Sequence, residues 1–289
     1  MIQPDATGQV RSFDGTRIAY QSFGDGAPII WGNGIGVGYR GVRLQLEHLR
    51  RRFRVVTLDH RGVFESDSPG SGGVGMEAHA RDCLAVADHL GLERPGYCGW
   101  SMGVQVGFEV LRLEPERFCR MACIGGVAGS PFRAALPLPG LDRALPAALE
   151  GLAKVAPALS PAVRALLPTT AMVRVATLAR FVRDRADRDC FVTMLRGVAS
   201  HDHRRYLQIL AEIGRHDAQA IVPTLQLPIL FVAGGDDYLT PRQELERLAS
   251  LAPHGEVHTV DGASHFVILE APAESNRLLE EFFGRHDRG

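Results

Sequence analysis

Lysine is almost absent from this sequence, because Lys154 is the only one and every other basic residue is an arginine. Long apolar runs are missing too: no stretch of about 18 uninterrupted apolar residues occurs, so we expect no membrane-spanning helix. The first 14 residues contain no basic segment followed by an apolar run, which argues against a secretory signal. These absences predict a soluble, cytoplasmic protein.

Cysteine is also scarce. The five cysteines form no close C-x-x-C pair, and their number is odd. This pattern argues against a disulfide framework and favours free, buried thiols in a reducing compartment. The cysteines are Cys83, Cys98, Cys119, Cys123 and Cys190.

Excess charge of either sign is lacking, since the formal net charge is −1. No overall electric field therefore points to nucleic acid or to an anionic membrane, and we expect a small-molecule partner instead. The length of 289 residues and the 45% hydrophobic content suit one large globular domain with room for an insertion. The oligomeric state has no signature in the sequence.

Strand-like and helix-like segments alternate along most of the chain. The expected strands are 10–23 (a hairpin turning at Asp14-Gly15), 28–31, 53–58, 96–99, 118–124, 228–233 and 256–260. The expected helices are 42–51, 76–90, 102–113, 241–252 and 273–283. This alternation predicts an α/β fold with right-handed crossovers and a mainly parallel sheet.

The alternation stops between residues 130 and 222. This segment has helical periodicity, several prolines and no convincing strand, and it carries 13 basic against 8 acidic residues, a net +5 that leaves −6 elsewhere. We interpret residues 130–222 as a helical cap (lid) lying over a core domain of residues 1–129 and 223–289. Its apolar residues favour a substrate with an apolar acyl or alcohol group. Its positive charge indicates either an anionic substrate or, more simply, a solvated surface.

A nucleophile motif lies between an expected strand and an expected helix, at Gly99-Trp100-Ser101-Met102-Gly103. A serine hydroxyl is a poor nucleophile unless a tight turn exposes it to a base, and flanking glycines permit such a turn. The motif fits G-x-S-x-G, in which the following helix points its N-terminus at the reacting centre. The alternative is a surface turn in which Ser101 only caps the helix.

At these residues the chain resembles the α/β-hydrolase superfamily over nearly its whole length outside the insertion. The stretch Asp59–Pro69 is similar to the family's D-x-R-G-x-G-x-S-x-x-P segment, and departs from it at Phe64, where the family commonly has glycine. The resemblance implies an α/β-hydrolase fold, with a mostly parallel eight-stranded sheet flanked by helices and a helical cap insertion.

The resemblance also implies an acid after the strand 228–233, at the fourth position of a G-x-x-D turn. That position selects Asp237, with its neighbour Asp236 as the competing choice. The acid would hold the catalytic histidine in one tautomer and stabilise its charged form. For the helix that follows, Thr240, Pro241 and Gln243 predict a capping box.

The base is expected at His265, because Gly262-Ala263-Ser264-His265-Phe266 resembles the family's G-x-x-H-F segment after the last strand. The chain order Ser, Asp, His is also the family's. His201 and His203 could suggest a metal site. However, residues two apart do not share a helix face and no matching ligand cluster appears, so we expect no metal.

The oxyanion hole needs two backbone N–H groups aimed at the developing negative charge. The resemblance assigns them to Met102 and Ile35, with Asn33 in place of the family's usual histidine. The glycines around Ile35 could instead cradle a phosphate, but no G-K-[ST] follows them. Trp100 and Asn33 are candidate substrate-pocket residues.

Together these residues predict a serine hydrolase that cleaves an ester, thioester or lactone through an acyl-enzyme, without a metal or organic cofactor. Three alternatives stay open: a cofactor-free haloperoxidase or perhydrolase, a carbon–carbon bond hydrolase, and a non-catalytic ligand receptor on the same scaffold. The family's dehalogenases and epoxide hydrolases use an aspartate nucleophile, so Ser101 argues against both.

Overall fold

Eight strands form one sheet in the order β1-β2-β4-β3-β5-β6-β7-β8, in a computed structural model that describes residues 2–135 and 140–285. β2 pairs antiparallel with β1 and with β4, and every other neighbouring pair is parallel. The strands are β1 (Ala6–Arg11), β2 (Arg17–Phe23), β3 (Ala27–Gly32), β4 (Phe53–Leu58), β5 (Gly96–Trp100), β6 (Met121–Ile124), β7 (Ile229–Gly234) and β8 (Gly255–Val260). The eight-stranded, mostly parallel sheet expected from the sequence is therefore confirmed.

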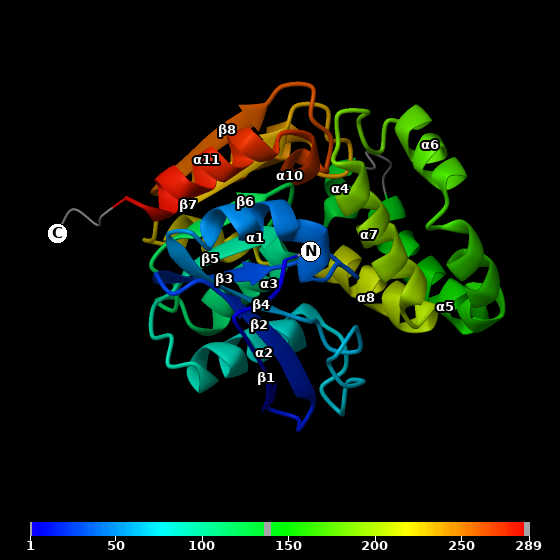
Figure 1. Ribbon diagram of the computed structural model, residues 1–289, viewed down its shortest axis with the longest axis horizontal. Helices are drawn as coiled ribbons and strands as arrows, with labels where there is room; N and C mark the ends of the chain where they lie inside the picture. The colour runs from blue at the N-terminus through cyan, green and yellow to red at the C-terminus, as the bar shows by residue number, and fades with distance from the viewer. Residues whose placement is uncertain (1, 136–139, 286–289) are drawn as a thin grey trace.

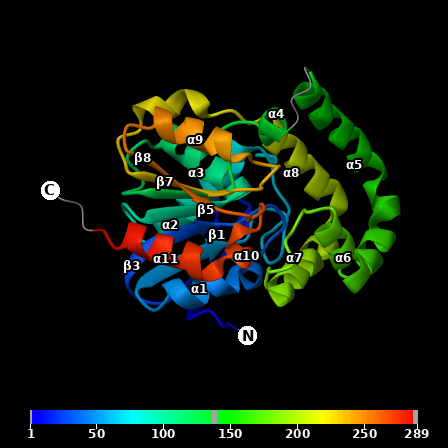
Figure 2. The ribbon, with the colours of Figure 1, turned by 90° about the horizontal axis from the view of Figure 1, so that it is seen from above.

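Helices cover both faces of this sheet. Figure 2 shows α1 (Arg43–Leu49) and α11 (Pro272–Phe283) on one face, with α2 (Met76–His89), α3 (Met102–Leu113) and α9 (Arg242–Leu251) on the other. Shorter elements are the 3-10 helices η1 (Tyr39–Val42) and η2 (Gln219–Thr224) and the single turn α10 (Val267–Glu270). Helices on both faces bury the central parallel strands, so every residue of β5, β6 and β7 is buried.

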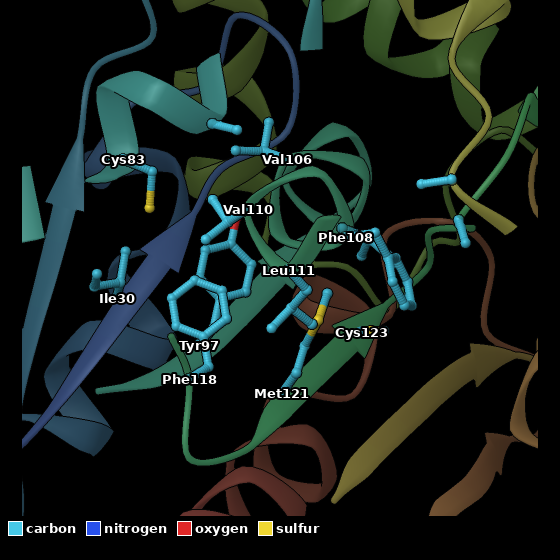
Figure 3. Packing of buried hydrophobic residues seen from close by; sticks show 14 of the residues in the cluster. Ile30, Cys83, Tyr97, Val106, Phe108, Val110, Leu111, Phe118, Met121 and Cys123 are labelled. Carbon is cyan, nitrogen blue, oxygen red and sulfur yellow. The ribbon is translucent and has the colours of Figure 1, made fainter. Parts of the chain in front are cut away.

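The hydrophobic core accordingly consists of two clusters, one on each face of the sheet. In the cluster on the α3 face, Tyr97 of β5 stacks on Phe118 with ring centroids 4.7 Å apart (Figure 3). Tyr97 also donates its hydroxyl hydrogen to the carbonyl of Gly103, over 2.6 Å. Tyr97 thus ties the core to the start of α3.

Between β6 and β7 the chain forms a lobe of helices at one end of the sheet (Figure 1). The helices are α4 (Pro131–Ala135), α5 (Leu141–Leu166), α6 (Thr170–Leu178), α7 (Arg188–Ser200) and α8 (His203–Arg215). The side chains of Thr169, Asp187 and Asp202 cap α6, α7 and α8. This is the expected helical insertion, and no described helix in it or elsewhere is both long and apolar enough to cross a bilayer.

Two local predictions were wrong. The expected strand 118–124 is shorter, since β6 begins only at Met121. The capping box at Thr240, Pro241 and Gln243 does not form: α9 begins at Arg242 and has no side-chain cap. The Thr240 hydroxyl instead donates to a carboxylate oxygen of Asp237, over 2.6 Å, and a charged acceptor makes the stronger hydrogen bond.

Candidate active site

Ser101 lies in a sharp turn between β5 and α3, with φ 54° and ψ −119°. Residues other than glycine rarely adopt this backbone conformation, and the tight packing around the turn depends on glycine. A Cβ atom on Gly103 would lie 2.0 Å from the carbonyl oxygen of Gly32, and one on Gly99 would lie 2.7 Å from the backbone of Gly103. The two flanking glycines therefore let β3, β5 and α3 meet closely enough to expose the serine.

The structure brings Ser101, His265 and Asp237 together from three separate loops at the carboxyl edge of the sheet. His265 Nε2 lies 2.9 Å from Ser101 Oγ, and His265 Nδ1 lies 2.9 Å from Asp237 Oδ2. The imidazole can therefore accept the serine proton at one nitrogen while the carboxylate holds the proton on the other nitrogen.

Asp237 is 5% exposed and well supplied with hydrogen-bond donors. Its Oδ1 accepts from the backbone N–H groups of Leu239 and Thr240, over 2.8 and 3.0 Å, and its Oδ2 accepts from the Thr240 hydroxyl. Burial by itself raises the pKa of this carboxyl. The charge of His265 and the hydrogen bonds of His265 and Thr240 outweigh burial and lower the pKa below 3.8. Asp237 is thereby held as a carboxylate.

Asp236, the competing acid, points elsewhere. Its side chain is 45% exposed, and its Oδ2 lies 2.5 Å from a guanidinium nitrogen of Arg183 in the insertion. The structure therefore brings Asp237, and not Asp236, to His265.

Glu270 organises the loop that carries His265. Its carboxylate accepts from the Ser264 N–H over 2.7 Å and from the Ser264 hydroxyl over 2.5 Å, immediately before the histidine. The indole N–H of Trp100 donates to the His265 carbonyl over 3.2 Å. This role of Glu270 could not be predicted, because nothing in the sequence distinguishes a carboxylate that supports a loop from one on the surface.

Two backbone N–H groups beside Ser101, those of Met102 and Ile35, are free to donate a hydrogen bond. Met102 is the first residue of α3, so its N–H has no partner within the helix. The Ile35 N–H donates to no acceptor within the described residues. Two histidines hold the loop around Ile35, since His60 Nε2 donates to the Asn33 carbonyl and His201 Nε2 to the Gly36 carbonyl, each over 3.0 Å.

Asn33 is 1% exposed, and its amide group has no hydrogen-bond partner among the described residues. His203, unlike His201, contacts Ser160 through its Nδ1 atom over 2.8 Å. In residues 2–135 and 140–285 no three His, Cys, Asp or Glu side chains are grouped to hold a metal ion.

A cavity of about 480 Å³ opens over Ser101 beneath the insertion. Its lining beside the serine includes Gly34, Ile35, Met102, Gly125, Gly126 and His265. The remaining lining is mainly apolar and includes Trp100, Phe132, Phe181, Phe191, Leu210 and Ile213. No described Arg, Lys, Asp or Glu lines this cavity. Trp100 thus forms part of the wall of this cavity, whereas Asn33 lies outside its lining.

The chain is similar in sequence to known α/β hydrolases. The family model described as alpha/beta hydrolase fold matches residues 32–272. A relative named putative carbamate hydrolase RutD, from Agrobacterium fabrum, is 27% identical over 241 residues, which cover 82% of this chain and 85% of the relative. A second relative, from Pseudomonas putida, is named 2-hydroxy-6-oxononadienedioate/2-hydroxy-6-oxononatrienedioate hydrolase 2. It is 28% identical over 279 residues, which cover 92% of this chain and 91% of the relative.

Among solved structures, a thermophilic esterase from Thermogutta terrifontis is similar in fold. The TM-score is 0.77, the sequence identity is 21%, and the match covers 96% of this chain and 98% of the esterase. At this identity the likeness concerns the fold alone.

Proposed function

The chain belongs to the α/β-hydrolase fold family, and from that membership we propose that it is a serine hydrolase of carboxylic ester-type bonds. We assign Ser101 as nucleophile, His265 as base and Asp237 as the acid that orients it. The observation that carries this proposal is the continuous chain of two 2.9 Å contacts from Ser101 through His265 to Asp237.

The proposed reaction has two stages. Ser101 Oγ attacks the acyl carbon while His265 Nε2 takes its proton, and the amides of Met102 and Ile35 hold the resulting oxyanion. His265 then gives the proton to the leaving atom, which is oxygen in an ester or lactone and sulfur in a thioester, as its bond to the acyl carbon breaks. In the second stage His265 takes a proton from water, which attacks the acyl carbon. The bond to Ser101 Oγ then breaks, the acid is released and the serine is restored.

The cavity supports an uncharged substrate with an apolar acyl or alcohol group, because apolar side chains make up most of its lining. In this proposal residues 130–222 form the cap that sets specificity, over a core domain of residues 1–129 and 223–289. Positioning these residues requires no metal or organic cofactor.

Carbon–carbon bond hydrolysis is the second candidate, favoured by the 28% identity to the dienedioate hydrolase of Pseudomonas putida. A dicarboxylate needs cationic partners when it is desolvated, and no described arginine or lysine lines the cavity. We therefore prefer an uncharged ester.

The test is hydrolysis of p-nitrophenyl butyrate, followed by the release of p-nitrophenol. We expect turnover by the wild type and a loss on the order of a million-fold in Ser101→Ala. Ser250→Ala, on the exposed surface of α9, is the matched control and is expected to keep full activity. Equal turnover by the wild type and Ser101→Ala would contradict the assigned nucleophile.

A further inference from the structure

A second, larger cavity of about 720 Å³ lies between the β1–β2 hairpin and α7. Its lining is more polar than that of the catalytic cavity, with Gln21, Asp59 and Glu65 on the core side and Arg196 and Ser200 on α7, although apolar surface still predominates. None of these residues lines the cavity over Ser101. The proposed reaction makes no use of this second space.

Met194 of α7 is the one described residue that lines both cavities. Met194 is 4% exposed and lies against the loop that leads into η1. A Cβ atom placed on Gly41 would be 2.8 Å from Met194 Cγ and 2.9 Å from Val37 Cγ1. Val37 lines the catalytic cavity and Gly41 lines the second one, so Met194 sits at the wall between them.

The rest of this wall contains few side chains that could replace Met194. Gly41 has none, and Gly197, one helical turn further along α7, lies so close to the loop that a Cβ atom would be 3.1 Å from the Gly36 carbonyl. The ring of Phe64 packs edge-on against His201, with centroids 4.5 Å apart, and closes the wall beyond Gly197. Removing the Met194 side chain beyond Cβ would therefore leave a gap.

We propose that Met194 is a specificity-determining residue that ends the apolar substrate pocket and so limits the length of the chain that an ester can carry. This inference rests on the proposed serine-hydrolase function. A thioether chain is unbranched and fills irregular gaps, which suits a closing residue between a loop and a helix. With Met194 shortened, a longer alkyl chain extends from the catalytic cavity into the second one.

The test uses alkyl fluorophosphonates of graded chain length, which report on the reactive serine and need no turnover. Second-order rate constants for labelling of Ser101 are measured for the wild type and for Met194→Ala. We expect the wild-type rate to fall beyond a limiting chain length. In Met194→Ala the limit moves to longer chains, with a gain of about fourfold for each additional methylene group that becomes buried.

Two variants serve as controls. Met194→Leu keeps the wall and is expected to keep the wild-type limit. Leu195→Ala removes side-chain volume from the catalytic cavity alone, since Leu195 does not line the second one, and is expected not to move the limit to longer chains. Thermal melting checks that each variant is folded, and Met194→Val replaces Met194→Ala if the alanine variant is not.

An unchanged chain-length limit in a folded Met194→Ala or Met194→Val variant that labels at Ser101 would overturn this inference and leave the proposed function intact. The same shift in Leu195→Ala would also overturn it, because added volume alone would then suffice. Absence of labelling at Ser101 in the wild type would remove the proposed function, and this inference with it.

Discussion

Ser101 presents its hydroxyl to His265 by means of a positive φ angle, and Asp237 holds the far side of the imidazole. Ser101, His265 and an aspartate in the 236–237 turn could be proposed from the sequence, because each follows a strand and their order along the chain is informative. The sequence could not decide between Asp236 and Asp237, since neighbouring residues of one turn point in different directions. Only the arrangement around Thr240 and Arg183 separates them.

Substituting each aspartate by asparagine tests this distinction. Asp237→Asn keeps the shape of the site but favours the wrong histidine tautomer, so we expect kcat for an ester to fall about ten-thousand-fold. Asp236→Asn only weakens an exposed pair with Arg183, and we expect activity near that of the wild type. Steady-state kinetics of both variants decide, and the reverse order of effects would make Asp236 the acid.

Asp59 is a residue whose ionisation costs stability. Burial raises the pKa of its carboxyl from 3.8 to about 6. Between these values the unfolded chain loses the proton before the folded one does, so stability decreases as the pH rises from about 4 to about 6. Above pH 6 the ionisation of Asp59 lowers the free energy of unfolding by about 3 kcal/mol in full.

Asp59→Asn removes this ionisation, and its side-chain oxygen can still accept from Gln21 and the Glu65 N–H. We expect the variant to be more stable than the wild type at pH 7.5, with an advantage that shrinks towards pH 4. Urea unfolding at several pH values measures the difference. A stability difference that stays constant from pH 4 to pH 8 would contradict the raised pKa.

Among the elements, the turn between β5 and α3 is the one whose shape depends most clearly on glycine. The pattern of glycines predicted this turn, because a tight approach excludes side chains. The helices of the insertion could not be placed individually from the sequence. Proline normally breaks a helix, yet α5 runs through Pro146, Pro157 and Pro161 while packing against α8.

Two glycine-to-alanine substitutions test the turn. In Gly103→Ala the new Cβ atom meets the Gly32 carbonyl, so β3 and α3 must separate, and we expect lower stability together with loss of ester hydrolysis. Gly151→Ala is the control, because Gly151 lies in α5 with open space around it. There alanine should raise stability by about 0.5–1 kcal/mol. Thermal melts and activity assays are compared, and an active, stable Gly103→Ala variant would contradict this account of the turn.

For the molecule as a whole, the sequence predicted the sheet, the separate helical segment and a substrate pocket, but neither the walls of that pocket nor the second cavity. Cavities arise where the insertion meets the core, and their walls come from residues far apart in the chain, such as Met194 and Gly41. The positive charge of the insertion and the negative charge of the core are matched by polar contacts between them. Arg183 of the insertion pairs with Asp236, and Arg185 donates to the Asp261 carbonyl.

The thiols report on the integrity of the whole fold. Four of the five cysteines are buried, and all five are free. Burial raises the pKa of Cys83 to about 12 and that of Cys98 well above 9.0, which leaves almost no thiolate at neutral pH. We expect Ellman's reagent to modify at most the partly exposed Cys119 in the native protein and five thiols after unfolding. Rapid reaction of two or more native thiols would contradict this packing.

The most direct test of the central claim is to locate the nucleophile chemically. The intact protein is treated with a fluorophosphonate, digested, and analysed by mass spectrometry. We predict a single adduct on the peptide that contains Ser101, absent from Ser101→Ala and formed far more slowly by His265→Ala, because the imidazole that removes the serine proton is missing. No adduct, or an adduct on another residue of the folded wild type, would contradict the proposed triad.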